Sequence, residues 1–158
     1  MPESKSIQVG QIAPDFTAAI QFPDKLEMIT LSKLLTLGQK VLLIFYPGDN
    51  TPGCTMQLCK IRDIYSEYKN KNVTVIGINH ATAESHLSFI QKQNYPFGIV
   101  VDEDKSIRES YGAVGSFFGK PTTRRSVFLI DTDGKVIFRF FGQQDNDKIM
   151  ELLDSLNK

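Results

Sequence analysis

The sequence predicts an α/β protein in which a mixed β-sheet is flanked by helices. Two observations support this. Short apolar runs rich in branched and aromatic residues recur along the chain, each bounded by Gly, Pro, Asn or Asp, as β-strands are. Segments with apolar residues at spacings of three and four lie between these runs, as in helices packed on a sheet. Strands that alternate with helices favour parallel pairing, and a closing hairpin makes the sheet mixed.

Five apolar runs are the expected strands: residues 41–46, 73–78, 97–101, 126–130 and 135–141. The first, VLLIFY, is apolar throughout, so we expect it to be central and buried on both faces. The segment DTDGK joins the last two runs and is expected to form a tight hairpin.

Three helices are expected from the apolar spacing. One follows Cys54, another covers residues 83–94, and a third covers residues 146–158. Their apolar faces are formed by Leu58, Ile61, Tyr65 and Tyr68 in the first, by Leu87 and Ile90 in the second, and by Ile149, Leu152, Leu153 and Leu156 in the third. Among the first forty residues, DFTAAI and EMIT are expected to form an edge hairpin, followed by a short helix in LSKLLTL.

Length and composition indicate one globular domain spanning residues 1–158, because no repeat, low-complexity tract or linker interrupts the chain. The formal net charge is zero, which gives no reason to expect a nucleic acid or an acidic membrane as partner. The longest apolar run is too short to span a bilayer, and the first ten residues contain no apolar segment of a secretory signal. Two cysteines are too few for a disulfide-scaffolded secreted domain, so a cytoplasmic location is expected.

The segment FYPGDNTPGCTMQLCK contains both cysteines of the chain. Thr51 is suited to cap a helix, and Pro52 to its first position, where a missing N–H costs nothing. Cys54 is then the third helical residue. Unpaired N–H groups and the helix dipole favour an anion there, so this thiol is expected to be substantially ionised and nucleophilic near neutral pH. The alternative is that Cys54 is a small buried hydrophobic residue.

Cys59 follows five residues later in the same expected helix. Helix geometry separates the two Cα atoms by roughly 8–9 Å, whereas a disulfide requires less than roughly 7 Å. The pair can therefore bond only if the first turns of the helix open. A bond that forms and breaks with local unfolding fits this spacing, and a permanent structural disulfide does not. The alternative for Cys59 is a residue of the apolar core.

Other kinds of site do not fit the spacing. A structural zinc site needs four ligands, and His80 and His86 supply no recognisable second half. The C-x4-C spacing is not that of a C-x-x-C oxidoreductase. Nothing marks either histidine as the partner of a protease cysteine. We expect the two histidines to be polar residues at a strand end and on a helix face. The segment GSFFGKPT lacks the order of a phosphate-binding loop.

The segment YPGDNTPGCTMQLCKIRD resembles the active site of the peroxiredoxins, whose pattern P-x-x-x-[TS]-x-x-C is met by Pro47, Thr51 and Cys54. The second cysteine resembles the bacterioferritin comigratory protein subfamily, also called the Q type. Flanking segments such as GQIAPDF and RSVFLIDTDGKV extend the likeness over most of the chain. The resemblance implies a thioredoxin-like fold.

It also implies the role of each site residue. Cys54 would be the peroxidatic thiolate and Cys59 the resolving thiol. By the motif R-x-x-F-L-I-D, the catalytic arginine would be Arg125, with the adjacent Arg124 as a second candidate. The Thr51 hydroxyl would orient the peroxide.

Two further groups complete the site that the resemblance implies. The backbone N–H groups of Gly53 and Cys54 would add hydrogen bonds to the peroxide. Pro47 would shield the thiol from water and shape the turn.

The implied function is a thiol-specific peroxidase that reduces hydrogen peroxide and organic hydroperoxides in antioxidant defence and cell redox homeostasis. Cys54 would form a sulfenic acid and then an intramolecular disulfide with Cys59, which thioredoxin or a similar thiol reductant would reduce. No metal or organic cofactor is implied. Because no cysteine lies near the C-terminus, we expect a monomer or weak homodimer. Two alternatives are a redox sensor that uses the same cysteine pair and a non-catalytic binding module.

Overall fold

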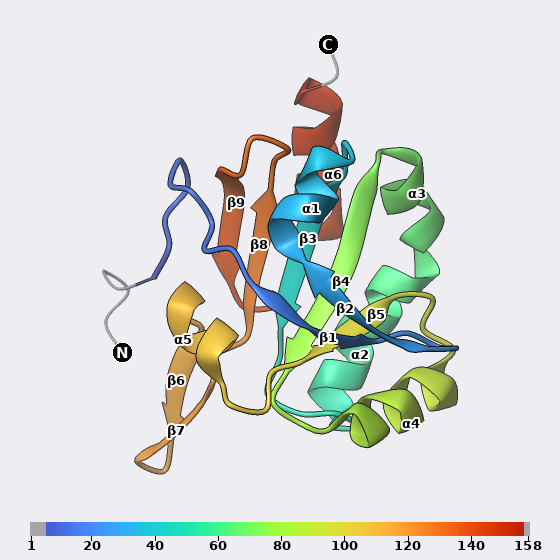
Figure 1. Cartoon of the computed structure of the whole chain (residues 1–158), viewed down its shortest axis with the longest axis vertical. Helices are drawn as coiled ribbons and strands as arrows, with labels where there is room; N and C mark the ends of the chain where they lie inside the picture. Colours follow the sequence, from blue (N-terminus) through green and yellow to red (C-terminus); the bar gives the residue numbers. More distant parts are fainter. Residues whose placement is uncertain (1–5, 157–158) are drawn as a thin grey trace.

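The computed structural model describes residues 6–156. A seven-stranded mixed sheet with the order β2-β1-β5-β4-β3-β8-β9 lies at its centre (Figure 1), which confirms the predicted α/β class. Its strands are β1 (Thr17–Gln21), β2 (Leu26–Thr30), β3 (Lys40–Phe45), β4 (Val73–Asn79), β5 (Gly98–Val101), β8 (Ser126–Ile130) and β9 (Val136–Phe141). The helices are α1 (Leu31–Thr36), α2 (Pro52–Asp63), α3 (Tyr65–Asn70), α4 (Ala83–Gln93), α5 (Ser106–Tyr111) and α6 (Asn146–Leu156).

Strand β3 is the centre of the sheet, as its apolar sequence predicts. It pairs in parallel with β4, where Leu43 lies opposite Ile76, and antiparallel with β8, where Leu43 lies opposite Phe128. Every side chain from Val41 to Tyr46 is fully buried. The expected hairpins β1–β2 and β8–β9 are also confirmed, and β2 forms one edge of the sheet.

The side chains of β3 alternate between two hydrophobic clusters, one on each face of the sheet. Leu42 and Ile44 join the cluster that also contains buried residues of α2, α3, α4 and α6. Leu43 and Phe45 join the other, which includes residues of α1 and α5. The helix that carries both cysteines therefore lies over the first of these faces, directly after the end of β3.

Several elements differ from the prediction. The helix expected after Cys54 is interrupted at Ile64, whose φ of −120° and ψ of 21° are not helical, so α2 and α3 are separate. Leu156 is 45% exposed rather than part of the apolar face of α6. Residues 157–158 of that expected helix lie outside the described part of the chain. Helix α5 was not predicted. Within residues 6–156, no helix has the length and apolar character needed to cross a membrane.

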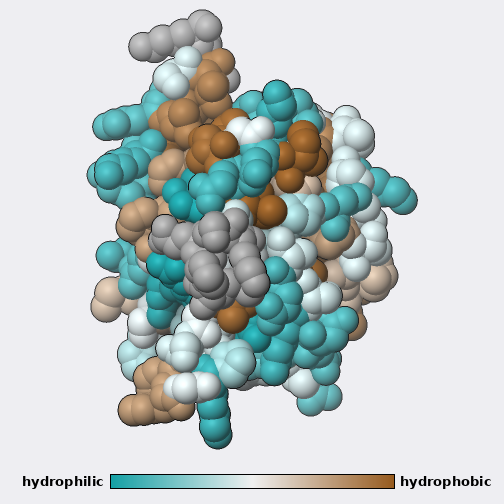
Figure 2. Space-filling view, turned by 90° about the vertical axis from the view of Figure 1, so that its left-hand side faces the viewer, coloured by the Kyte–Doolittle hydropathy of each residue, from teal (hydrophilic) through white to brown (hydrophobic). Residues whose placement is uncertain are grey.

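A short hairpin of β6 (Val114–Phe117) and β7 (Lys120–Thr123) was also not predicted. It projects from the lower end of the molecule (Figure 1). Phe117 and Phe118 at its tip are 67% and 90% exposed, and their rings contact each other. The space-filling view shows an apolar surface at the lower end of the molecule (Figure 2). The strands escaped prediction because they are short and lack an apolar alternation.

A buried carboxylate anchors the loop between β3 and α2. Asp49 accepts hydrogen bonds from the Tyr46 hydroxyl at 2.6 Å and the Ser85 hydroxyl at 2.6 Å, and it lies 2.7 Å from Nδ1 of His86. The other ring nitrogen of His86 lies 3.3 Å from the Asn79 carbonyl oxygen. The two ring nitrogens of His86 therefore face oxygen atoms of the loop and of β4. His86 lies in α4, as the prediction of a helical polar residue requires, and its side chain is fully buried.

Burial by itself raises the pKa of Asp49, but hydrogen bonds and the charge of His86, with hydrogen bonds from Ser85 and Tyr46, outweigh it and hold the pKa below its ordinary value of 3.8. Burial, followed by the charge and hydrogen bond of Asp49, raises the pKa of Tyr46 well above its ordinary value, so its hydroxyl stays a neutral donor. The carboxylate thus ties the loop before α2 to α4.

Replacing Asp49 with asparagine tests this anchor. Breaking a buried pair of this kind is expected to lower the free energy of unfolding by roughly 3 kcal/mol at pH 7. Because the pKa of Asp49 is lowered in the folded chain, the ionised carboxylate stabilises the fold above about pH 4 and loses this effect as the pH falls through its folded-state pKa. Urea unfolding should therefore show a larger loss in Asp49→Asn at pH 7 than at pH 3.

The matched control for this experiment is Asp24→Asn, which changes an exposed carboxylate in the β1–β2 turn. It should alter the unfolding free energy little at either pH. An equal loss at pH 7 and pH 3 in Asp49→Asn would show that the ionised carboxylate does not stabilise the loop.

Candidate active site

Helix α2 begins where the sequence predicts. Thr51 has the extended conformation of an N-cap residue, and Pro52 is the first helical residue. The Thr51 side chain does not cap the helix, however. Its hydroxyl donates a hydrogen bond to the Gly48 carbonyl at 2.9 Å, back within the loop. Thr51 is exposed, so its oxygen can still accept a hydrogen bond from a small molecule in front of the helix.

The Cys54 side chain is fully buried in the first turn of α2, and its thiol is free. Nη1 of Arg125 lies 3.4 Å from Cys54 Sγ and also donates a hydrogen bond to Oε1 of Gln57 at 2.5 Å. Arg125 immediately precedes β8, and Ser126 pairs with Phe45 at the end of β3. The pairing of β3 with β8 therefore brings two residues 71 positions apart into contact.

Two backbone features allow the Arg125 guanidinium to lie beside Cys54. The Gly142 N–H donates to the Arg125 carbonyl at 2.8 Å, which fixes the backbone beside the end of β9. A Cβ on Gly53 would lie 3.3 Å from Nη2 of Arg125, so a larger residue there would press on the guanidinium. Arg124, the second candidate, stacks instead over the Phe141 ring at 3.7 Å. Of the two arginines, Arg125 is the one next to the sulfur.

Gln57 is a site residue that the sequence reasoning missed. It is fully buried, its side-chain oxygen accepts from Arg125, and its backbone carbonyl accepts a hydrogen bond from Gln144 Nε2 at 3.1 Å. Residues three apart on a helix lie on the same face, so its spacing from Cys54 was the available signal. Gln144 lies beyond β9 and carried no signal in the sequence.

Cys59 is half-buried in α2 and packs against the same hydrophobic cluster as Cys54. Its Sγ lies 3.7 Å from Oε1 of Gln93 and 3.6 Å from the Tyr95 hydroxyl. Both cysteines are free and belong to one continuous helix. The structure therefore shows the separated, unbonded arrangement that the helical spacing predicts for the reduced chain.

The remaining predicted residues lie around this centre or away from it. Pro47 is half-buried in the loop that Asp49 anchors. His80 is exposed and His86 is engaged by Asp49, so neither contacts a cysteine thiol through a hydrogen bond. Within residues 6–156, no three His, Cys, Asp or Glu side chains gather in a way that could hold a metal ion.

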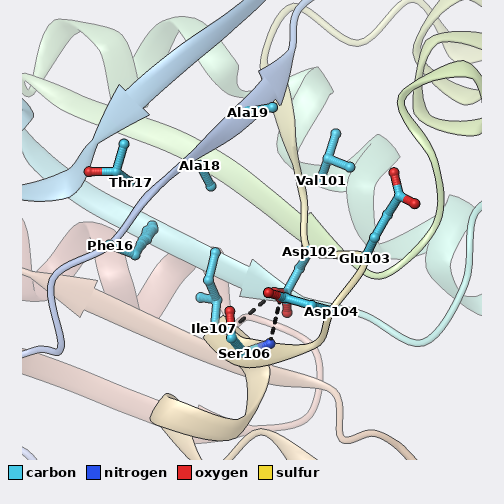
Figure 3. Close-up of a pocket in the computed structure, with 10 residues that line it drawn as sticks. All are labelled: Phe16, Thr17, Ala18, Ala19, Val101, Asp102, Glu103, Asp104, Ser106 and Ile107. Carbon is cyan, nitrogen blue, oxygen red and sulfur yellow. Dashed lines mark hydrogen bonds between the residues drawn. The ribbon is translucent and has the colours of Figure 1, made fainter.

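A cavity of about 510 Å³ lies elsewhere in the molecule, away from the cysteines (Figure 3). It lies between β1 and the segment 101–107 and contains no cysteine. The most buried carboxylate in its wall, Asp102, accepts the N–H groups of Ile107 and Arg108 at 3.1 and 3.0 Å. Because the Asp102 carboxylate already accepts these N–H groups at the start of α5, we assign it a structural role.

Comparison with known proteins places these features in a family. Residues 9–139 match the model of the AhpC/TSA family. A protein of Coxiella burnetii named as a peroxiredoxin bcp is 42% identical over 135 residues, which cover 83% of this chain and 86% of that protein. One of the same name in Helicobacter pylori is 36% identical over 156 residues, covering 96% and 99% of the two chains.

Solved structures agree with the sequence relatives. The peroxidoxin BcpB of Mycobacterium tuberculosis has a TM-score of 0.82 at 26% identity and covers 95% of this chain and 98% of its own. A cysteine-to-serine mutant of PrxQ from Xylella fastidiosa has a TM-score of 0.84 at 21% identity, covering 96% and 98%. The fold is therefore thioredoxin-like, as the resemblance implied. With a buried cysteine beside an arginine at the start of α2, the chain belongs to the AhpC/TSA family and, within it, to the peroxiredoxins of the bcp or Q type.

Proposed function

We propose that this protein is a thiol peroxidase that reduces hydrogen peroxide and organic hydroperoxides, with Cys54 as the attacking residue. The observation that carries the proposal is the placement of Cys54 Sγ in the first turn of α2, 3.4 Å from the Arg125 guanidinium. In the reaction, the Cys54 thiolate attacks one peroxide oxygen and the O–O bond breaks. The products are Cys54–SOH and, after uptake of one proton, the alcohol or water.

The neighbours of the sulfur suit this transition state. Negative charge moves from sulfur to the leaving oxygen, so fixed donors along that line lower the barrier. Arg125 supplies a permanent positive charge that Gln57 holds in place. The N–H groups of Gly53 and Cys54 lie in the first turn, where helix geometry leaves them without intrahelical partners. The exposed Thr51 oxygen can accept the peroxide O–H, and Pro47 shields the sulfur from bulk water.

Burial of the sulfur bears on the substrate. Because Cys54 is fully buried, a peroxide must displace a neighbouring side chain to reach Sγ. This favours small hydroperoxides over bulky ones. It also keeps the thiol from reacting with large electrophiles or with the disulfide of another protein.

Cys59 is the resolving residue in this proposal. Its thiol condenses with the Cys54 sulfenic acid, forming the disulfide and releasing one water. The reductant is thioredoxin or a similar dithiol protein, which exchanges with that disulfide. The proposal includes action as a monomer or weak homodimer in the cytoplasm, in antioxidant defence and redox homeostasis. The position of Cys59 in the same helix as Cys54 supports resolution within one chain.

Peroxide consumption with thioredoxin, thioredoxin reductase and NADPH tests the two cysteines. Wild type should turn over, and Cys54→Ser should be inactive because no other cysteine can take its place. In Cys59→Ser, Cys54 should be oxidised once by peroxide, and turnover should then stop because no disulfide forms for thioredoxin to reduce. Full turnover in Cys59→Ser would show that an external thiol resolves the sulfenic acid. If wild type forms the Cys54–Cys59 disulfide but shows no catalytic turnover with any thiol donor, the protein is a redox sensor and not a peroxidase.

Adjacent arginines allow a matched test of the guanidinium. Arg125→Gln should lower the second-order rate constant for hydrogen peroxide by roughly 100- to 1,000-fold, the usual cost of removing one transition-state donor. Arg124→Gln removes the same charge one residue away, where the side chain stacks on Phe141. It should leave the rate constant within a few-fold of wild type. Equal effects of the two substitutions would contradict the assignment of Arg125.

A further inference from the structure

Tyr95 lies between α4 and β5, in a position fixed by its surroundings. The left-handed Asn94 ends α4 and turns the chain, and the Tyr95 N–H donates to the Ile90 carbonyl at 3.1 Å. The Tyr95 ring stacks on Phe97 with centroids 5.1 Å apart and meets Phe89 edge to face at 5.1 Å. The side chain is 1% exposed. Its hydroxyl therefore has little freedom to choose its partners.

That hydroxyl reaches α2 between the two cysteines. It donates a hydrogen bond to the Thr55 carbonyl at 3.2 Å and lies 3.6 Å from Cys59 Sγ. Thr55 and Cys59 are four residues apart, so in a helix they are the two ends of one hydrogen-bonded turn. A single phenol thus contacts both ends of the turn that separates the two thiols.

Hydrogen bonds to Gln93 add to the contact between this turn of α2 and the end of α4. The Cys59 thiol donates to Oε1 of Gln93 at 3.7 Å, and Nη1 of Arg62 donates to the Gln93 carbonyl at 2.7 Å. These bonds join α2 to the end of α4, just before Tyr95. Burial, followed by the hydrogen bond with Cys59, raises the pKa of Tyr95 far above its ordinary value. The hydroxyl therefore remains a protonated donor at neutral pH.

The turn from Thr55 to Cys59 must open for the cysteines to react. Residues five apart in a helix are too distant for a disulfide, so condensation of Cys54–SOH with Cys59–SH, which forms the S–S bond and releases water, needs this turn unwound. Unwinding removes both the Thr55 carbonyl and the Cys59 sulfur from the Tyr95 hydroxyl.

We propose that Tyr95 is a positioning residue that holds this turn closed and thereby sets the rate of disulfide formation. This inference rests on the proposed peroxidase function. While the turn is closed, the sulfenic acid can meet a second peroxide, which transfers one oxygen to give Cys54–SO2H and leaves as an alcohol or water. The Tyr95 hydroxyl therefore also sets how much peroxide the enzyme tolerates before it is over-oxidised.

Tyr95→Phe is a clean test because the ring contacts are kept and the hydroxyl alone is lost. The first-order rate of disulfide formation, followed by rapid quenching, thiol alkylation and mass spectrometry, should rise about fivefold, the factor expected for one net hydrogen bond. The hydrogen peroxide concentration that over-oxidises half of Cys54 should rise by about the same factor. The second-order rate of Cys54 with peroxide should stay unchanged.

Tyr111→Phe is the matched control. Tyr111 is also fully buried, and its hydroxyl donates to the Pro14 carbonyl at 2.6 Å in the opposite hydrophobic cluster. Its loss should reduce global stability without changing the rate of disulfide formation. An unchanged rate in Tyr95→Phe would overturn the proposal, and so would a slower one, which would mean that the hydroxyl activates Cys59.

Hydrogen exchange separates this inference from the proposed function. In the reduced protein without peroxide, the backbone amide of Cys59 should exchange about fivefold faster in Tyr95→Phe than in wild type. Tyr111→Phe should not show this local change beyond its effect on global unfolding. Failure of peroxide turnover in wild type would refute the peroxidase alone, whereas unchanged exchange at Cys59 would refute the role of Tyr95.

Discussion

The buried carboxylate of Asp49 is the interaction on which the geometry of the site depends. It lies in the loop between the central strand and the helix that carries both thiols, and it binds groups from both sides of that loop. The Tyr46 hydroxyl ties it to the end of β3, while Ser85 and His86 tie it to α4. A loop between rigid elements is usually the most mobile part of a fold. Here one carboxylate ties the loop to β3 and α4, directly before the helix that carries Cys54.

Helix α2 serves two requirements that conflict. As an intact helix it presents Cys54 at its N-terminal turn, where a thiolate is stabilised, beside Arg125. The same regular geometry keeps Cys59 beyond bonding distance. In the proposed cycle the chain meets the two requirements in turn, because the start of a helix can unwind without loss of the sheet. Gln93 and Tyr95 contact the turn of α2 that has to unwind before the disulfide can form. Asp49 anchors the loop before α2, which keeps its conformation.

Much of the fold could be predicted from the sequence, and the reasons are specific. Strand β3 was predictable because a continuous apolar run fits only a strand covered on both faces. The start of α2 was predictable because Thr51 and Pro52 mark a helix start, and Arg125 because its motif precedes a recognisable strand. Helix α5 and the hairpin β6–β7 were missed because they are short and lack a regular apolar pattern, so their form depends on contacts that no local pattern encodes.

The site residues that were missed share one property: each acts through a partner distant in the sequence. His86 was expected only as a polar residue of a helix face, because its carboxylate partner, Asp49, lies 37 residues earlier. Tyr95 was not singled out in the sequence, because its partners Thr55 and Cys59 lie 40 and 36 residues away. Gln57 is nearer to Cys54, but the reason for its burial is a guanidinium 68 residues away. Such pairs are visible only in the three-dimensional structure.

The Arg125 guanidinium has a consequence for the charge balance of the reaction cycle. Its two acceptors differ, since Gln57 Oε1 is neutral throughout, whereas in the proposed reaction the Cys54 sulfur attacks as an anion. Conversion of the thiolate to a neutral sulfenic acid leaves the half-buried cation with no counter-charge at that contact. An unpaired charge is more stable in water than in a protein interior. In the proposed cycle, oxidation of Cys54 to the sulfenic acid therefore weakens the contact between Cys54 and Arg125. The loss of this contact favours the unwinding of α2 that disulfide formation with Cys59 requires.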